Sequence, residues 1–133
     1  MAANTQVYGN GVLDFGIVPV TVSKATGIVA HRFLKADGSD YAATEDSSCG
    51  VSTAIVTAAN VTNSQNSTNA AISGQVLVEA SAAIAIYALL ELEAGTATGR
   101  VVTHVSGSIR GKALAAAGAA GDIIPVQIYP GMK

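Results

Sequence analysis

The chain is divided into short runs of β-branched and other apolar residues, which recur roughly every 8 to 12 residues between turn-forming residues. In the run at 17–23, Val18, Val20 and Val22 alternate with more polar or turn-forming residues. Pro19 interrupts the hydrogen-bond donors of this run, so the run is expected at a sheet edge or near a strand start. Further runs lie at 28–34, 41–44, 51–57, 76–80, 100–105, 108–114 and 123–129. Short strands at this spacing indicate an all-β fold, either a small β-barrel or a β-sandwich.

The composition limits how such a fold is packed. At 133 residues, the chain has the length of a single domain with its own core. Half of the residues are hydrophobic, yet there is no Trp, so the core must be packed from small and branched side chains. Only 12% of the residues are charged, against about 25% in an average soluble domain. Because little charged surface is available, we expect other protein to cover part of the surface.

The first segment, residues 1–16, is predicted to be an extended arm. Its three glycines and irregular apolar pattern fit neither a helix nor a regular strand. The remainder, 17–133, is predicted to form one β domain, in which the polar stretch near 60–74 is a surface loop. Three large side chains of the arm would be exposed without a protein contact: Tyr8, Leu13 and Phe15. We expect them to form an intersubunit contact, and the alternative is an arm folded back onto its own domain.

The two halves of the chain resemble each other. Residues 20–34 align with 76–90 without a gap, and Gly-Val-Ser at 50–52 aligns with Gly-Lys-Ala at 111–113. One interpretation is an internal duplication, and the other is the chance similarity of simple sequences. The segment 82–92 is ambiguous by itself, since Ala and Leu favour helix while its large apolar residues fall on every second position. A duplication would make it β-type, because its counterpart contains a glycine and several β-branched residues.

Residues 115–121 carry no side chain larger than a methyl group. Alanine favours helix, but each of the two glycines in this stretch costs about 1 kcal/mol relative to alanine. The stretch leads directly into the alternating run at 123–129. We therefore predict a tight connection, at most one helical turn long, in which backbone passes close to backbone. Leucine at Ala117 or Ala120 is then expected to disturb folding or assembly.

Residues that carry chemistry are sparse. His31 and His104 lie in strand-like runs without a second ligand at metal-binding spacing, so hydrogen-bonded or surface roles are expected for both. The single Cys49 makes neither an internal disulfide nor a redox pair. No nucleophile elbow or phosphate-binding glycine loop is present in the sequence. The sequence thus indicates a protein that is not an enzyme and uses no metal or cofactor. The competing interpretation is a small β-barrel enzyme that uses His31 or His104.

Charge and hydropathy narrow the class of partner. The net charge is −2, and the seven Lys and Arg residues are scattered along the chain. Direct binding to nucleic acid or to an acidic membrane needs a positive stripe, so neither is expected. The longest apolar run, 82–90, is shorter than the roughly 20 residues that span a bilayer. The first residues lack a basic region followed by an apolar core, so no signal peptide is expected.

The most specific motif begins with Gly-Lys-Ala-Leu at 111–114. An Ala-rich turn, Gly-Asp at 121–122 and Ile-Ile-Pro-Val-Gln-Ile at 123–128 follow it. This order resembles the closing motif of the capsid decoration proteins, also called head cement proteins, of tailed bacteriophages. The strand and turn order over most of 17–129 is similar to that family as well. The N-terminal arm has no match in it, and the Asn-rich stretch looks longer than usual.

The resemblance implies a compact, β-tulip-like fold bound to the outside of an assembled capsid, often as a trimer, where it ties neighbouring shell subunits together. It implies the major capsid protein as partner, a place on the virion surface after synthesis in the host cytoplasm, and no active site. The alternative from another class is a β-sandwich adhesion or carbohydrate-binding module of a phage fibre or cell surface. Such a module is expected to display aromatic residues for stacking on sugars, and the absence of Trp counts against it.

Overall fold

In the computed structural model, which describes residues 15–132, nearly all regular structure is β-strand. One short helix, α1, spans Ala58–Thr62. The strands are β2 (Phe15–Thr21), β3 (Gly27–Ile28), β4 (Phe33–Lys35), β5 (Ser48–Ser52), β6 (Val56–Thr57), β7 (Ser67–Glu79), β8 (Leu89–Leu92), β9 (Val101–Thr103), β10 (Ile109–Ala113) and β11 (Ile123–Met132). The all-β prediction is therefore confirmed.

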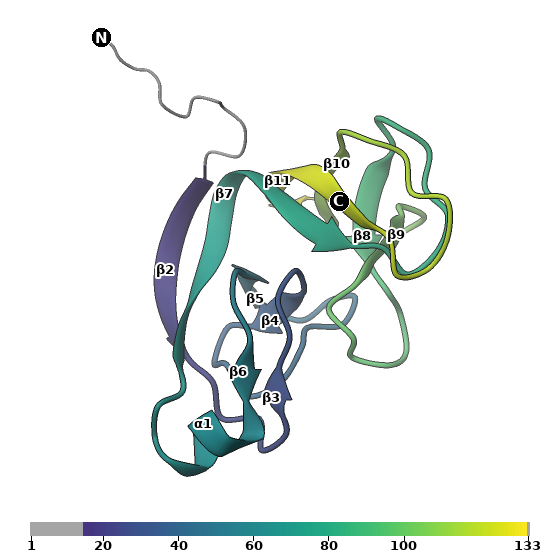
Figure 1. Cartoon of the computed structure of the whole chain (residues 1–133). Helices are drawn as coiled ribbons and strands as arrows, with labels where there is room; N and C mark the ends of the chain where they lie inside the picture. Colours follow the sequence, from purple (N-terminus) through teal and green to yellow (C-terminus); the bar gives the residue numbers. More distant parts are fainter. Residues whose placement is uncertain (1–14, 133) are drawn as a thin grey trace, which may run out of the picture.

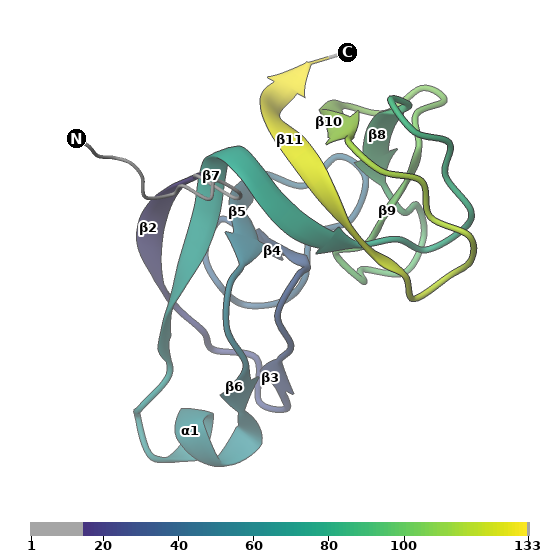
Figure 2. The same ribbon diagram turned by 45° about the horizontal axis from the view of Figure 1, so that its top comes forward.

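Most strands belong to one strongly curled sheet. Its order is β4-β5-β7-β11-β10-β8-β9. Strand β2 lies outside this order and pairs with the edge of β7 that faces away from β5 and β11. The long strand β7 serves both halves of the chain, because its first part pairs with β2 and β5 and its second part with β11 (Figure 1). A second sheet contains only β3 and β6. As a result, β3, β6 and α1 lie at one end of the molecule, and β8, β9 and β10 lie at the other (Figure 2).

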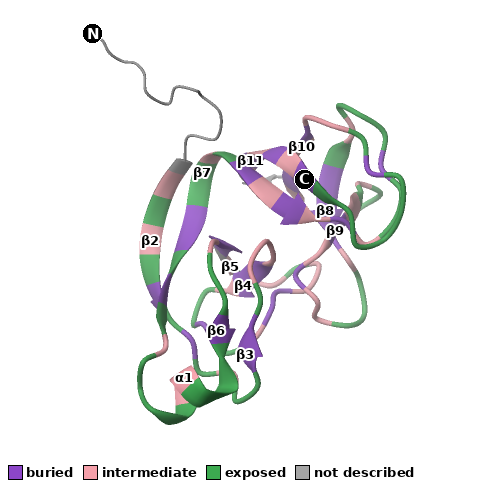
Figure 3. Cartoon of the chain, in the orientation of Figure 1, coloured by how far each residue is buried: buried purple, intermediate pink, exposed green. Residues whose placement is uncertain are grey.

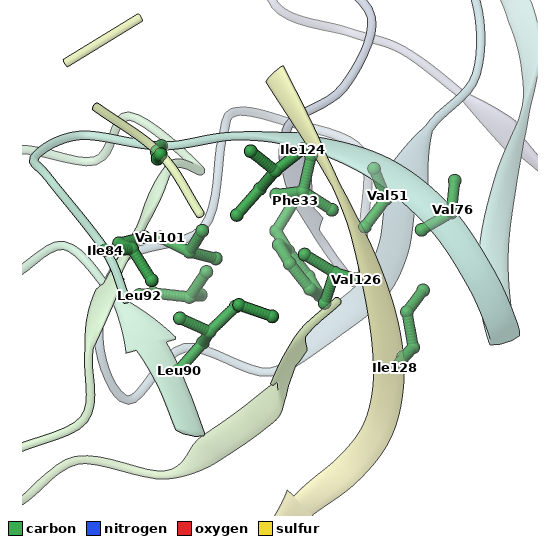
Figure 4. Close-up of a cluster of buried hydrophobic side chains, with 14 of the residues drawn as sticks. Phe33, Val51, Val76, Ile84, Leu90, Leu92, Val101, Ile124, Val126 and Ile128 are labelled. Carbon is green, nitrogen blue, oxygen red and sulfur yellow. The ribbon is translucent and has the colours of Figure 1, made fainter. Parts of the chain in front are cut away.

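Each half of the chain has a hydrophobic cluster of its own, and buried positions alternate with exposed ones along the strands (Figure 3). The smaller cluster contains Val20, Val22, Ile28, Leu34, Tyr41, Val56 and Ala70. The larger cluster contains most buried side chains of the second half, and four residues of the first half complete it: Phe33, Ala42, Val51 and Ala71. Phe33 lies among the side chains of Ile124 and Val126 (Figure 4).

The strand pairing shows the internal duplication. In the first half Leu34 pairs with Gly50, and in the second half Leu90 pairs with Gly111. These are the residues that the sequence alignment places together. Neither glycine has room for a side chain, because a Cβ atom on either one would overlap the backbone of the neighbouring strand. The same close approach of two strands is thus built twice.

A second pairing also recurs in the two halves. Ile28 pairs with Val56 in the first half, and Ile84 forms an isolated bridge with Ala117 in the second. All four side chains are buried. Ala117 is therefore the counterpart of a core valine, and the predicted tight connection at 115–121 is confirmed, without a helical turn.

His31 and Tyr87 are also equivalent, and they share an uncommon backbone conformation. Their φ angles are 72° and 68°, in a region that non-glycine residues rarely adopt. The His31 N–H donates to the Ser52 carbonyl, and the Tyr87 N–H donates to the Ala113 carbonyl, both at 2.8 Å. Ser52 and Ala113 are again aligned positions, so the duplicated halves contain the same turn.

This turn corrects two expectations. It divides the expected strand at 28–34 into β3 and β4, and it restricts the strand within 82–92 to β8. The alignment also needs one correction. The Val22 N–H donates to the Asn66 carbonyl at 2.9 Å, and the Ala80 N–H donates to the Asp122 carbonyl at 2.8 Å, so the neighbouring pair Val20–Thr68 corresponds to Val78–Ile124. Val20 is therefore equivalent to Val78, two residues beyond the position given by an alignment without gaps.

The polar stretch near 60–74 is not a continuous loop, contrary to the sequence prediction. Thr57 caps α1 through a reciprocal capping box with Asn60, which explains how a stretch without large apolar residues begins a helix. From Ser67 onward the chain forms β7, where buried Thr68 and Ala70 alternate with exposed polar residues. Strand β2 likewise begins at Phe15, within the segment assigned to the arm.

Candidate interaction surfaces

The two histidines have structural contacts. The His31 backbone carbonyl accepts from the Glu79 N–H at 2.8 Å, which ties the turn of the first half to the second. The His104 ring places Nε2 3.0 Å from the Gly107 carbonyl oxygen. Among residues 15–132, no group of three or more His, Cys, Asp and Glu side chains is placed to hold a metal ion. The side chain of Cys49 is outside what the structure describes.

The acidic residues of the turns at 37–40 and 45–46 are engaged locally. Asp37 accepts from both the N–H and the hydroxyl of Ser39. Asp40 forms an ion pair with Lys24 at 2.9 Å. The Asp46 carboxylate accepts from the Ala43 N–H. These contacts agree with solvated turns whose carboxylates stabilise the turn itself.

Glu91 and Glu93 contact different partners. Glu93 accepts from the Thr98 hydroxyl and lies 3.4 Å from Arg100. Glu91 is buried, and its Oε1 accepts from three consecutive backbone N–H groups at 2.9, 3.0 and 2.7 Å, those of Val105, Ser106 and Gly107. Burial raises the pKa of Glu91, but these hydrogen bonds and nearby His104 outweigh it and leave that pKa below its usual value.

Glu91 thereby fixes the loop 104–108. Glu45 holds the far end of this loop, accepting from the N–H and the hydroxyl of Ser108 at 3.1 Å. Gly107 sits so close to Thr44 that a Cβ atom would lie 2.6 Å from the Thr44 methyl carbon. The ordered loop displays Val105, which is 81% exposed. An exposed apolar side chain on a firmly held loop is suited to insertion into a partner surface.

A first apolar surface lies at the end formed by β3, β6 and α1, which we call the tip. Val29 directly follows Ile28, and Ile55 directly precedes Val56, the residue with which Ile28 pairs. Val29 is 41% exposed and Ile55 is 63% exposed. Helix α1 beside them has no acidic residue in its first turn and no basic residue in its last. Helix α1 thus adds no charged side chain to the tip, and Lys24, just before β3, is ion-paired with Asp40.

The second apolar surface lies on the outward face of the second half. Leu89 pairs with Lys112, Lys112 with Gln127, and Gln127 with Gln75, so these four residues form one row across four strands, which we call the outer row. Tyr87 extends it, because the Lys112 ammonium lies 5.4 Å from the centre of the Tyr87 ring. Leu89 is 41% exposed, and Tyr87 is 62% exposed.

The outer row has a counterpart in the first half, where Phe33 pairs with Val51 and Val51 with Ala71. We call these three residues the buried row. They correspond to Leu89, Lys112 and Gln127, but they are buried because they complete the larger hydrophobic cluster. The same sheet face is thus covered in one half and open in the other.

Of the residues predicted to make an intersubunit contact, Tyr8 and Leu13 lie outside the described residues. Phe15 begins β2, and its Cα pairs with that of Gly74. Sequence reasoning missed Val29, Ile55 and Leu89 as surface residues. Their alternation with core residues was visible, but pattern alone does not tell which face of a strand is covered.

No known family model matches the chain, and no curated protein matches it. In the part of the chain that the structure describes, no helix is long and apolar enough to cross a membrane.

Proposed function

We propose that this chain is a structural virion protein that binds the outer surface of an assembled phage capsid and stabilises it by bridging neighbouring shell subunits. The observation that carries the proposal is the tip, where Val29 and Ile55, next to the pair Ile28–Val56, are both exposed apolar residues. Low overall charge and the motif at 111–128 point to the same role. In this proposal the tip contacts the major capsid protein.

Bridging requires a second contact, and the loop at 104–108 supplies it. Val105 follows β9 by two residues, and β9 lies at the end of the molecule opposite the tip (Figure 2). Because Glu91 and Glu45 hold this loop in place, little conformational entropy is lost when Val105 inserts into a partner. A molecule with an apolar contact at each end joins two neighbours. Association into trimers on the capsid surface is part of the proposal.

Stabilisation follows from mass action. A protein that binds the assembled lattice more tightly than free subunits shifts the equilibrium toward the lattice. Each contact is small, but it is repeated over the whole shell. The proposed role requires no reaction and no cofactor.

The test is co-sedimentation of the purified full chain with the capsid particles that it accompanies, followed by thermal disruption of those particles. Wild type is expected to bind and to raise the disruption temperature, whereas Val29→Lys with Ile55→Lys is expected to bind much more weakly. The matched control is Ala85→Lys with Ala116→Lys, which places the same charges at the equivalent exposed positions of the second half. Full binding by the tip variant would contradict the role of the tip. Unchanged capsid stability with wild type, or specific glycan binding in its place, would contradict the function.

A further inference from the structure

The outer row is an open surface whose counterpart in the same molecule is covered. The buried row, which belongs to the first half, is covered by side chains of the second half. In the second half, no described residue covers Leu89 to a similar degree. The large apolar residues Leu89 and Tyr87, at one end of a polar row, form the kind of surface that binds an amphipathic segment.

The chain outside the described residues begins next to this row. Phe15 pairs with Gly74, and Gly74 also pairs with Ile128, so β2 and β11 lie on opposite sides of β7 at this point. Gln75, which follows Gly74, is the last residue of the outer row. The described chain therefore begins, at Phe15, next to the edge of the outer row.

The length of the segment matches the width of the row. From Phe15 across β7, β11 and β10 to Leu89 there are four strand spacings, or about 19 Å at about 4.8 Å each. Tyr8 precedes Phe15 by seven residues. An extended chain covers about 23 Å over that length, at about 3.3 Å per residue. A segment that crosses the strands thus brings Tyr8 to Leu89.

The chemistry of the segment also matches the row. Tyr8 would lie against Leu89 and Tyr87, near the Lys112 ammonium, where an aromatic ring is favoured. The residues Gly9, Asn10 and Gly11 would cross the Gln127 and Lys112 positions, and glycine allows the backbone to approach closely. Amide side chains such as that of Gln127 both donate to and accept from a crossing backbone. Asp14 is the only charged side chain of residues 1–14, so the segment does not repel Lys112.

We propose that residues 1–14 fold back across the outer row of their own molecule, with Tyr8 on Leu89. The same molecule is the source because a tethered segment that reaches its site has an effective concentration in the millimolar range, far above that of a second copy in dilute solution. The segment then covers the second half as the second half covers the buried row. This docking is intramolecular and does not depend on the capsid-binding role.

Protease sensitivity tests the docking in the full chain. Chymotrypsin cuts after Tyr8 only when that residue is accessible, and mass spectrometry measures the loss of residues 1–8. Leu89→Lys is expected to increase the cleavage rate severalfold over wild type. The matched control, Val29→Lys, changes a side chain with the same 41% exposure on the tip and should leave the rate unchanged. Equal rates in wild type and Leu89→Lys would overturn the proposal.

A second measurement does not depend on how Leu89→Lys folds. Tyr8→Ala leaves every described residue unchanged, and it is expected to shift the amide NMR signals of Leu89 and Lys112 but not those of Val29 and Ile55. Signals of Leu89 and Lys112 that stay unchanged would contradict the docking.

Oxidative cross-linking identifies which molecule supplies the segment. In a Cys49→Ser background, Tyr8→Cys with Leu89→Cys is expected to form a disulfide within one molecule, seen as a monomer on a non-reducing gel. Tyr8→Cys with Val29→Cys should not. A disulfide-linked dimer from the first pair would show that the segment docks on a second copy and would overturn the proposal, as would the absence of any disulfide.

Discussion

Phe33 and Leu89 occupy equivalent positions in the two halves of the chain, yet Phe33 is 3% exposed and Leu89 is 41% exposed. Each begins the first strand after the shared turn. Phe33 pairs with Val51, Leu89 pairs with Lys112, and Val51 and Lys112 are themselves aligned positions. The difference arises because the second half packs on Phe33, whereas Leu89 faces outward. The duplication thus placed one sheet face in the core and left its copy on the surface.

This difference in exposure predicts that replacing Phe33 or Leu89 with alanine lowers the free energy of unfolding by unequal amounts. Phe33→Ala is expected to lower the free energy of unfolding by about 3–5 kcal/mol, since it removes a buried aromatic side chain and leaves a cavity. Leu89→Ala is expected to cost about 1 kcal/mol, because Leu89 is 41% exposed in the described domain and its truncation leaves no cavity in the core. Urea unfolding followed by circular dichroism measures both variants. Equal losses would mean that the two sheet faces are equally covered.

The Glu91 carboxylate is expected to make the stability of the fold depend on pH. Glu91→Gln should lower the free energy of unfolding at neutral pH by about 1.5–3 kcal/mol, because three backbone N–H groups lose a charged acceptor. The folded-state pKa of Glu91 lies below its unfolded value. Its contribution is therefore complete above the unfolded pKa of about 4.3 and is lost as the pH falls through the folded value.

Unfolding measured between neutral and acidic pH checks this sign. The difference in the free energy of unfolding between wild type and Glu91→Gln should be largest at neutral pH and should narrow below about pH 4. His104 and Glu45 are the other titratable groups facing this loop, so His104→Gln and Glu45→Gln serve as controls. A gap that widens in acid would contradict the role of the Glu91 carboxylate.

Gly111 is expected to tolerate no side chain. A Cβ atom at this position would lie 2.5 Å from the Gln127 carbonyl oxygen and 2.7 Å from a Val126 methyl carbon, so β10 and β11 would have to separate. We expect Gly111→Ala to cost about 1–3 kcal/mol. Gly118→Ala is the control, because its Cβ atom would only touch Asp122 at an ordinary 3.5 Å. Thermal unfolding should separate the two variants clearly, and equal melting temperatures would contradict the close approach.

The alanines of the tight connection are expected to differ in how well they tolerate a larger side chain. Ala117 is buried and bridges to Ile84, so Ala117→Leu would overpack the larger cluster and lower the melting temperature. Ala120 is exposed, so Ala120→Leu should be tolerated, contrary to the equal sensitivity that the sequence predicts. Soluble yield and thermal unfolding of the two variants decide between these outcomes.

The parts of the fold that sequence could predict were those with a local cause. The alternation in β2, the turn glycines and the tight connection before β11 follow from residue type and spacing. The duplication was visible too, although the two-residue shift between Val20 and Val78 depends on strand register, which a simple alignment does not contain. The turn at His31 and Tyr87 escaped prediction, because non-glycine residues adopt a positive φ only rarely.

The candidate surfaces were less predictable, for a physical reason. Phe33 and Leu89 have similar hydrophobicity and equivalent neighbours, so no local pattern distinguishes a buried position from an open one. What separates them is the packing of one half on the other, which is a property of the whole chain. The loop at 104–108 was likewise hidden, since its order comes from the distant acceptors Glu91 and Glu45.

Cryo-electron microscopy of the particle that this chain accompanies tests whether the chain decorates a capsid through its tip. The account predicts density for the domain on the outer surface of the shell, with Val29 and Ile55 against the major capsid protein and Val105 against a neighbouring subunit. Particles without outer density for this chain, or a domain bound with its tip facing solvent, would contradict the account.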